Sequence, residues 1–164
     1  MPDGTLVHSV LDPSAPAGSS GDWTDAPSLA VGLILPGVES KIHVHPVVGQ
    51  ITWVMSGQLT VKMKDRHVDN PYTLHLSAGQ CVVTSPGTFV QWINAGPAPC
   101  RVLYIVSPAF VFETGDEGSV VYNDAVVLDE DWDALAGLNW PHPGPDHVEA
   151  ARQARQRAIE RRGR

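Results

Sequence analysis

The sequence predicts an all-β fold: a small antiparallel β-barrel or sandwich followed by a C-terminal helix. The middle of the chain consists of short apolar or alternating runs separated by turn residues, which is typical of sandwiches and barrels. The 14 prolines and 15 glycines favour many turns and short strands over long helices. A chain of 164 residues is long enough for one domain with a single core.

The expected elements begin with an N-terminal arm at residues 1–22, in which 5–11 is a strand candidate and 12–22 is a loop or linker rich in Pro, Ser, Gly and Ala. The apolar run at 28–35 is typical of a buried strand. Residues 23–125 are expected to form the barrel. Further strands are predicted at 41–45, 50–56, 58–64, 72–76, 81–84, 89–93 and 101–107.

Residues 126–164 are expected to form a C-terminal extension. The stretch 129–135 resembles a short acidic helical turn, and 146–162 is a helix candidate. Asp146 as N-cap and Glu149 three residues later match a capping box. The arginines of this basic helix are interpreted either as a solvated face or disordered terminus, or as a surface that docks onto an acidic surface of a neighbouring subunit.

Charge is divided unevenly along the chain, whose net charge is −7. Residues 1–145 carry a charge of −10, whereas residues 146–164 carry +3. An acidic body argues against nucleic acid as the main partner. No apolar run is long enough to span a membrane, and the N-terminus lacks the features of a signal peptide, so a cytoplasmic location is expected.

The candidate site is built around His43 and His45, which lie on the same face of a strand because they are two residues apart. Gln50 adds a third polar side chain from the next strand. Two neutral imidazoles and an amide are typical of a metal site or a polar-ligand site. If Gln50 points inward, alternation also sends Thr52 inward. The spacing of Cys81 and Cys100 matches no metal or redox motif, so both are interpreted as small buried residues.

The pattern G-x5-H-x-H-x4-Q-x6-G at 37–57 resembles the first motif of the cupin superfamily, which normally has glutamate at the position of Gln50. The second cupin motif is degenerate but in register, with Gly79, Gly87 and Asn94 in place. Ser85 replaces the motif's proline, and Val90 stands where the family has its last metal-binding histidine. The resemblance covers roughly residues 29–108. It implies a cupin-type antiparallel jelly-roll β-barrel with the site inside the barrel mouth.

The resemblance also implies a divalent transition metal, such as iron, manganese, nickel or zinc, with His43, His45 and Gln50 as ligands. All three are neutral, and without the glutamate and the third histidine we expect the ion to be held more weakly by several kcal/mol. Open coordination positions nevertheless suit a catalytic metal. Gln50 has a second interpretation as a hydrogen-bonding group only.

Further site residues are predicted from strand alternation. The expected catalytic residues are His43, His45 and Tyr104, and the expected substrate-binding residues are Gln50, Thr52, Phe89, Val90 and Trp92. Phe89, Trp92 and Tyr104 either line an aromatic ligand cavity or belong to an ordinary core. Tyr72 or Tyr104 could act as a general acid. Gln91 would replace the missing ligand only if a bulge shifted the register. The histidines expected at the surface are His8, His67, His75 and His142.

Two functions from different classes follow. The first is a metal-assisted oxygenase, isomerase, cyclase or lyase that acts on a small organic substrate, or a metal-free enzyme in which His43 or His45 is a general base. The alternative is a non-catalytic small-ligand-binding or sensor barrel whose metal site has decayed. We also expect a homodimer formed through 31–35 and 110–112.

Overall fold

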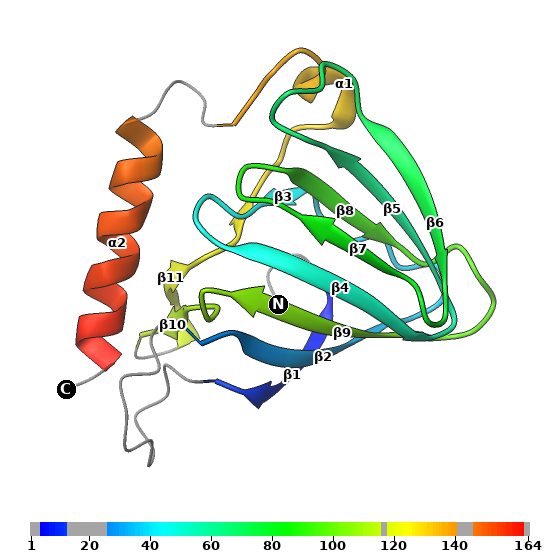
Figure 1. The fold of residues 1–164 in the computed structure, drawn as a ribbon, viewed down its shortest axis with the longest axis horizontal. Coiled ribbons are helices and arrows are strands. Elements are labelled where there is room, and N and C mark those ends of the chain that lie inside the picture. Colours follow the sequence, from blue (N-terminus) through cyan, green and yellow to red (C-terminus); the bar gives the residue numbers. More distant parts are fainter. Residues whose placement is uncertain (1–3, 13–25, 116–117, 141–145, 163–164) are drawn as a thin grey trace.

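The computed structural model describes residues 4–12, 26–115, 118–140 and 146–162, and most of these residues form antiparallel β-structure. Two five-stranded sheets face each other around the core, while a hairpin and a long C-terminal helix lie at one end of the barrel (Figure 1). The prediction of an all-β jelly-roll barrel with a C-terminal helical extension is therefore confirmed.

Strand order defines the two sheets, and every strand pair is antiparallel. Sheet A contains, in spatial order, β1 (Leu6–Leu11), β2 (Ser28–Ile34), β9 (Cys100–Ser107), β4 (Gly49–Ser56) and β7 (Cys81–Thr84). Sheet B contains β12 (Val126–Val127), β3 (His43–Val44), β8 (Phe89–Ile93), β5 (Gln58–Lys64) and β6 (Tyr72–Ser77). The hairpin consists of β10 (Phe112–Thr114) and β11 (Val120–Asn123), and the two helices are α1 (Trp132–Leu135) and α2 (Asp146–Arg162).

Alternation along the strands produces the core between the sheets. On β4, Gln50, Thr52 and Val54 are buried, whereas Ile51 and Trp53 are exposed, so the predicted facing of this strand is confirmed. The largest buried apolar side chains of the main core are Ile34, Leu59, Val61, Met63, Trp92 and Val102. Residues 81–84 alternate in the same way, which leaves Cys81 exposed on the outer face of β7, contrary to the prediction, whereas Cys100 is buried.

The residues that carry the cupin resemblance close tight turns. Gly57 joins β4 to β5 at a φ of 84°, and a Cβ there would lie 2.8 Å from the Pro99 carbonyl oxygen. Gly87 has a φ of 88°, and its N–H donates to the His45 carbonyl at 2.9 Å. The buried Asn94 amide donates to the Ile34 carbonyl at 2.9 Å. These residues therefore hold the strands that carry the histidines.

Two strands of the sheets lie outside the residues that were expected to form the barrel. β1 lies in the expected arm but pairs with β2, and β12 lies in the expected extension but pairs with β3. Both strands supply partners for the backbone groups of a sheet edge, a tertiary requirement that no local pattern indicates. The expected linker from residue 13 onward, His142 and the Asp146 side chain lie outside the described residues. None of the described helices is long and apolar enough to cross a membrane.

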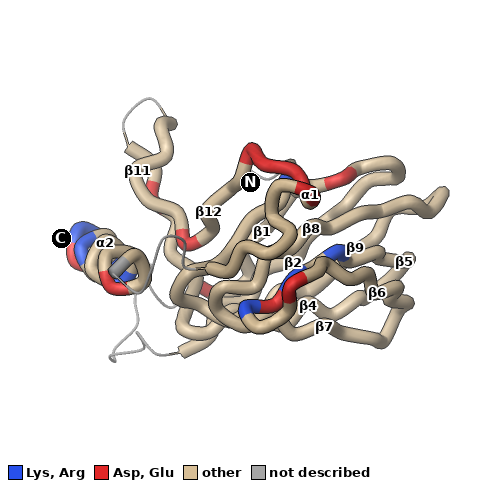
Figure 2. Tube along the Cα trace, turned by 90° about the horizontal axis from the view of Figure 1, so that it is seen from above, with Lys and Arg blue, Asp and Glu red and all other residues tan. Residues whose placement is uncertain are grey.

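Helix α1 covers part of sheet B. Asp131 caps it by accepting the Ala134 N–H at 2.9 Å, and its Trp132 and Leu135 side chains pack against Phe89 of β8. The segment after α1 is held by the buried Lys64, whose ammonium donates to the Leu138 carbonyl and to the Asn139 side chain. Acidic residues gather on the segment that leads into α1 (Figure 2).

Helix α2 docks onto its own barrel. Ala158 and Arg155 are buried, and the Arg155 guanidinium donates from Nε to Asp124 Oδ2 at 3.2 Å. At the end of the helix, Arg161 forms an ion pair with Glu113 of the hairpin. The solvated-face interpretation is therefore wrong for the buried Arg155, whereas Arg161 stays exposed although it is paired with Glu113. Their partners come from distant parts of the chain, which the helical pattern does not reveal.

Candidate functional site: a buried histidine pair facing an aromatic cavity

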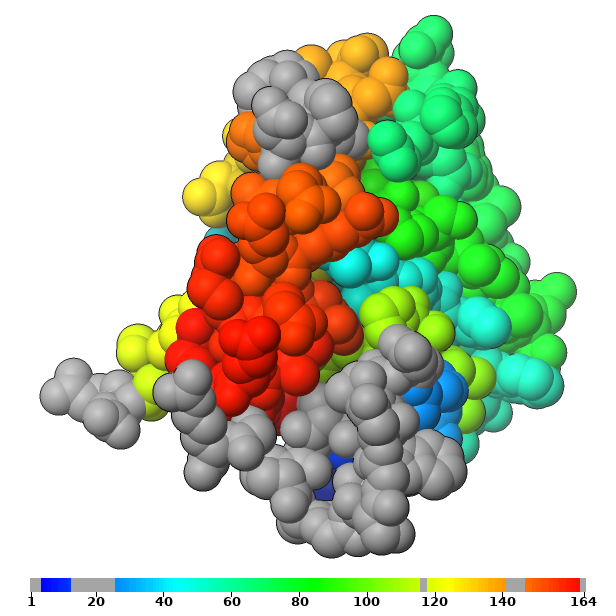
Figure 3. Space-filling view, turned by 60° about the vertical axis from the view of Figure 1, so that its left-hand side comes forward, coloured from blue at the N-terminus to red at the C-terminus, as the bar shows by residue number. Residues whose placement is uncertain are grey.

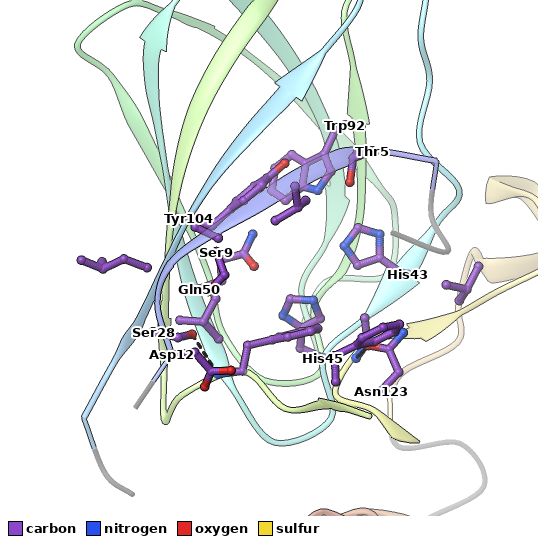
Figure 4. Close-up of a pocket in the computed structure, with 18 of the residues that line it drawn as sticks. Thr5, Ser9, Asp12, Ser28, His43, His45, Gln50, Trp92, Tyr104 and Asn123 are labelled. Atoms are coloured by element: carbon purple, nitrogen blue, oxygen red, sulfur yellow. Dashed lines mark hydrogen bonds between the residues drawn. The ribbon is translucent and has the colours of Figure 1, made fainter. Parts of the chain in front are cut away.

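A cavity of about 280 Å³ lies inside the barrel, between the inner faces of the two sheets and the hairpin. Figure 4 shows His43, His45 and Gln50 pointing toward this space, with Trp92 and Tyr104 at its far end. The wall is largely apolar and aromatic. The polar side chains that line it are Thr5, Ser9, Asp12, Ser28, His43, His45, Gln50, Asn123 and Arg162, together with the phenol of Tyr104.

The two histidines lie next to each other because β3 places alternate residues on one face. Both are buried, and their ring centroids are 5.4 Å apart. The His43 ring lies 6.1 Å from the ring of Trp92, and the His45 ring lies 5.8 Å from that of Phe110. Val44, between them, points the opposite way into the cluster under α1. An aromatic ring therefore lies beside each imidazole.

A hydrogen bond determines which nitrogen of His43 carries a proton, and burial determines the protonation of His45. His43 Nδ1 lies 3.2 Å from the Lys41 carbonyl oxygen, and a ring nitrogen that faces a carbonyl must carry the proton. Nε2 of His43 is then the nitrogen with the lone pair. Burial, together with the nearby His43, lowers the pKa of His45 to about 3. His45 is therefore neutral near pH 7, the form that accepts hydrogen bonds and binds metals.

Gln50 is oriented by its neighbours in sheet A. Its Nε2 donates to the Thr52 hydroxyl at 2.9 Å, and the Thr84 hydroxyl donates to its backbone carbonyl at 3.3 Å. The amide nitrogen is thus directed at Thr52, which leaves Oε1 as the acceptor that Gln50 can offer to the cavity. Thr52 is fully buried behind Gln50 and does not itself line the cavity. Its placement suits orienting Gln50 better than direct contact with a ligand.

Tyr104 reaches the cavity because β2 carries a glycine diagonally across from it, at Gly32, which pairs with Val102. A Cβ on Gly32 would lie 2.5 Å from the Tyr104 ring and 2.8 Å from Val102, so only glycine leaves room for the ring in this position. The Tyr104 and Trp92 ring centroids are 6.2 Å apart. The two rings together form one aromatic wall of the cavity and also belong to the main core cluster.

Two predicted substrate-binding residues lie elsewhere. Phe89 precedes Val90 on β8 and faces the opposite side of the strand, where it packs under α1, so its predicted place in the cavity wall is wrong. Val90 belongs to the main core and does not line the cavity, although it pairs in register with His43. Gln91 faces outward, where it donates to the Ser40 carbonyl and accepts from Trp132 Nε1.

Several cavity residues come from segments that the sequence reasoning assigned differently. Phe110 and Phe112, which were expected in a dimer interface, line the cavity instead. Asp12 and Arg162, from opposite ends of the chain, form an ion pair of 3.1 Å and also line it. The spacing of the two phenylalanines is the one local signal that indicates a shared face. The other contacts depend on how the hairpin and α2 fold back over the barrel.

The donor set fits a divalent metal ion only in part. The described residues contain no group of three or more His, Cys, Asp and Glu side chains that could hold a metal. His43, His45 and Gln50 provide two imidazole nitrogens and an amide oxygen, and the side chain in register with His43 is a valine. Such a set is compatible with a weakly held ion that keeps open positions, since no ligand carries a charge.

The comparisons with known proteins agree with this architecture. Residues 31–106 match the family model described as Cupin domain. An uncharacterized conserved protein with a double-stranded beta-helix domain from Klebsiella pneumoniae has a TM-score of 0.50 at 22% identity, over 77% of this chain and 85% of that chain. Peruvianin-I, a cysteine peptidase from Thevetia peruviana latex, has a TM-score of 0.54 at 11% identity, over 77% and 68%.

A third structure is the capsular polysaccharide assembling protein CapF from Staphylococcus aureus. Its TM-score is 0.51 at 18% identity, and the match covers 65% of this chain but 27% of that chain. No curated protein matches the chain significantly. At these identities the structural likeness shows the fold alone, so the function has to be argued from the cavity.

Proposed function

Because the barrel belongs to the cupin superfamily, we propose that this protein binds a small organic molecule in its cavity and converts it with the help of a weakly held divalent metal ion. The observation that carries the proposal is the pair of buried imidazoles, His43 and the neutral His45, beside Gln50 at the wall of an otherwise largely apolar cavity. Burying such polar groups without ligands is unfavourable, which supports a functional role for them.

The cavity favours a small ligand with a large apolar part. Its volume of about 280 Å³ lies at the lower end of the range of roughly 300–1,000 Å³ for ligand sites. The rings of Trp92, Tyr104 and Phe110 would pack against the apolar part. A carbonyl, carboxyl or hydroxyl group of the ligand would lie at the polar side, near His43 and Gln50.

His43 Nε2, His45 and Gln50 Oε1 are the atoms that would hold the ion. Bound there, iron, manganese, nickel or zinc would supply Lewis-acid activation of an oxygen-bearing group or a binding position for dioxygen. The protein would contribute the cavity that holds the substrate. In the metal-free alternative, where no ion occupies its lone pair, the neutral His45 would be the proton acceptor. The Tyr104 phenol, on the same wall, would serve as proton donor. The reaction classes consistent with these roles are oxygenase, isomerase, cyclase and lyase.

A metal-free binding or sensor barrel is the second candidate. It is favoured by Val90, which stands in register with His43 where a third imidazole would be needed, and by the neutral Gln50. In this case the imidazoles and the amide would recognise polar groups of the ligand through hydrogen bonds. The cavity and its aromatic wall would have the same role in both functions.

Metal analysis separates the two candidates. Wild-type protein, purified without chelators and also reconstituted with each of the four metals, would be compared with the His43→Ala, His45→Ala double variant. The exposed His75, whose Nδ1 lies 3.1 Å from the Thr60 hydroxyl, provides the matched control His75→Ala. We expect near-stoichiometric metal in the wild type and the control, and loss of metal in the double variant.

Protein that holds no metal after reconstitution would contradict the metal-assisted function and favour the binding barrel. A screen of small aromatic and aliphatic carboxylic acids by thermal shift would then test binding directly. A ligand at 100 times its dissociation constant should stabilise the folded protein by roughly 2.7 kcal/mol. If the double variant responded to such ligands like the wild type, the histidine pair would not be part of the site.

A further inference from the structure

One end of the cavity carries a pair of opposite charges. Among the described residues that line the cavity, Asp12 is the one carboxylate and Arg162 is the one Lys or Arg side chain. Arg162 Nη2 lies 3.1 Å from Asp12 Oδ2, and the two side chains are 22% and 26% exposed. Figure 4 shows Asp12 at the end of the cavity opposite Trp92 and Thr5. The charged end is therefore in contact with solvent, whereas the aromatic rings line the other end.

The N-terminal strand places Asp12 at the cavity through a change of register. On β1, Val7 and Ser9 line the cavity, as strand alternation requires. The same alternation would bring Leu11 inward, but the pairing with β2 shifts between Ser9 and Leu11. After this bulge Asp12 lines the cavity, and Leu11 is exposed. Bulges next to binding sites re-aim side chains in this way.

The last turn of α2 brings Arg162 to the same end of the cavity. The helix is attached to the barrel by the ion pair of Arg155 with Asp124, and Arg161, next to Arg162, pairs with Glu113. In Figure 3 the orange and red atoms of α2 lie on the surface of the barrel, beside the yellow hairpin. Two ion pairs of the same helix thus hold the segment from which the Arg162 guanidinium reaches the cavity.

The neutral polar groups at this end are oriented as hydrogen-bond donors. Asn123 Oδ1 accepts the Ala125 N–H at 3.0 Å, so this amide presents its NH2 group to the cavity. The buried Ser28 Oγ accepts the Phe110 N–H at 2.9 Å, and the hydroxyl keeps its proton to donate. Figure 4 shows both side chains at the same end as Asp12. A guanidinium with two neutral donors is a set of groups that suits a carboxylate.

The wall that carries the histidines offers acceptors instead. His45 is neutral, and Gln50 Nε2 donates to Thr52, so Gln50 presents Oε1 to the cavity. Lone pairs of this kind hold a metal ion or accept from a hydroxyl group, but without an ion they repel the oxygens of a carboxylate. The two sides of the cavity therefore differ in the groups that they bind.

We propose that the cavity takes a carboxylic acid with a large apolar part, and that the carboxylate of this ligand replaces Asp12 as the ionic partner of Arg162. The inference rests on the proposed function, since it names the class of molecule that the cavity binds. A partly exposed ion pair contributes little to stability, so exchange of one carboxylate for another costs little free energy. The displaced Asp12 is hydrated at the surface, and the ligand also accepts hydrogen bonds from Ser28 and Asn123.

Three probes with the same phenylpropyl skeleton test the charge preference. They are 3-phenylpropanoate, 3-phenylpropanamide and 3-phenylpropylamine, each titrated by isothermal calorimetry into the protein as purified. The anion should bind at least about 10-fold more tightly than the amide, because hydrogen bonds to a charged group contribute more than those between neutral groups. The amine should bind most weakly, since its ammonium group would face the donors at this end.

Three variants test the roles of the individual residues. Arg162→Met should lower the affinity for the anion at least about 10-fold and change that for the amide less than about 2-fold. Asp12→Asn should raise the affinity for the anion at least about 3-fold, because it removes the competing carboxylate. Asn123→Asp keeps the oxygen that accepts the Ala125 N–H but replaces the donor by a negative charge, so the anion should bind at least about 10-fold more weakly. Arg157→Met, exposed on α2, is the matched control and should bind all probes like the wild type.

Circular dichroism of each variant establishes that it is folded. Equal affinity of the wild type for anion and amide would overturn the carboxylate proposal and leave the proposed function in place. Anion affinity that stays unchanged in both Arg162→Met and Asn123→Asp would also overturn it, because the carboxylate would then bind elsewhere in the cavity. Tightest binding of the amine, or weaker anion binding in Asp12→Asn, would contradict the exchange. A wild type that binds neither anion nor amide would contradict the proposed function as well, so the two failures are distinguished by the amide.

Discussion

The buried ion pair between Asp124 and Arg155 attaches α2 to the barrel, and its removal has a predictable cost. The Asp124 side chain is 1% exposed and that of Arg155 is 10% exposed. Asp124 also accepts the Val111 N–H at 2.7 Å and the Tyr122 hydroxyl at 2.8 Å. The other arm of Arg155 donates to the Ala109 carbonyl. One carboxylate thus connects α2, β11 and the chain leading from β9 into the hairpin.

Arg155→Met keeps most of the side-chain volume but leaves the Asp124 carboxylate buried without its cation. Breaking a buried pair in this way costs about 3–5 kcal/mol. We expect the lower limit, about 3 kcal/mol, because the hydrogen bonds from Val111 and Tyr122 remain. In a chain of this size the melting temperature should fall by roughly 6–12 °C. Adding Asp124→Asn removes the buried charge and should recover at least about 1 kcal/mol.

The pH dependence of the loss identifies its cause. Burial raises the pKa of Asp124, and Arg155 opposes that rise. Without Arg155 the folded-state pKa lies further above its unfolded value, so the folded protein binds the proton more tightly than the unfolded chain does. The loss in free energy of unfolding caused by Arg155→Met should therefore become smaller as the pH falls from 7 toward about 4, the pKa of an aspartate in the unfolded chain.

Urea denaturation at pH 7 and pH 5 measures both effects. Arg157→Met, an exposed substitution on the same helix, is the control and should change the free energy of unfolding by less than about 0.5 kcal/mol. A loss below about 1 kcal/mol for Arg155→Met, or a loss that grows toward acid pH, would refute the reasoning. The first result would mean that α2 is not held by the pair, and the second that the carboxylate is not the origin of the cost.

Two further predictions concern the cavity. Gln50→Glu combined with Val90→His should raise the affinity for zinc or manganese at least about 100-fold, because it adds an anionic ligand and a third imidazole; unchanged affinity in isothermal titration would show that these positions do not face the ion. Gly32→Ala should displace the Tyr104 ring, whose nearest atom would lie 2.5 Å from the new Cβ, and lower stability by about 1–3 kcal/mol. The same variant should weaken ligand binding, and a melting temperature equal to that of the wild type would contradict this.

The cavity combines residues from inside and outside the segment that matches the cupin family. Residues 31–106 supply the two histidines, Gln50 and the aromatic wall. Ser9, Phe112 and Arg162 come from β1, the hairpin and α2, which lie outside that segment. The parts that set the shape of the cavity are therefore those least related to the family motif, and ligand preference should depend on them.

The local pattern was sufficient for the strands and for the histidine pair. Period-two alternation depends only on backbone geometry, so it correctly placed Gln50, Thr52 and Trp92 on the inner side. The same rule, applied strictly, places Phe89 on the outer side of β8, opposite Val90. Phe89 was predicted in the cavity because it is aromatic, although its position next to Val90 in the strand places it on the other side.

Contacts between residues far apart in the chain were decided by the tertiary structure alone. The sequence by itself determined the antiparallel barrel, its turns and the spacing of His43 and His45, because these depend on residues close together in the chain. The Asp12–Arg162 pair, the Gly32–Tyr104 contact and the burial of Arg155 join residues far apart. Such contacts depend on how the elements pack, and no local propensity specifies that packing.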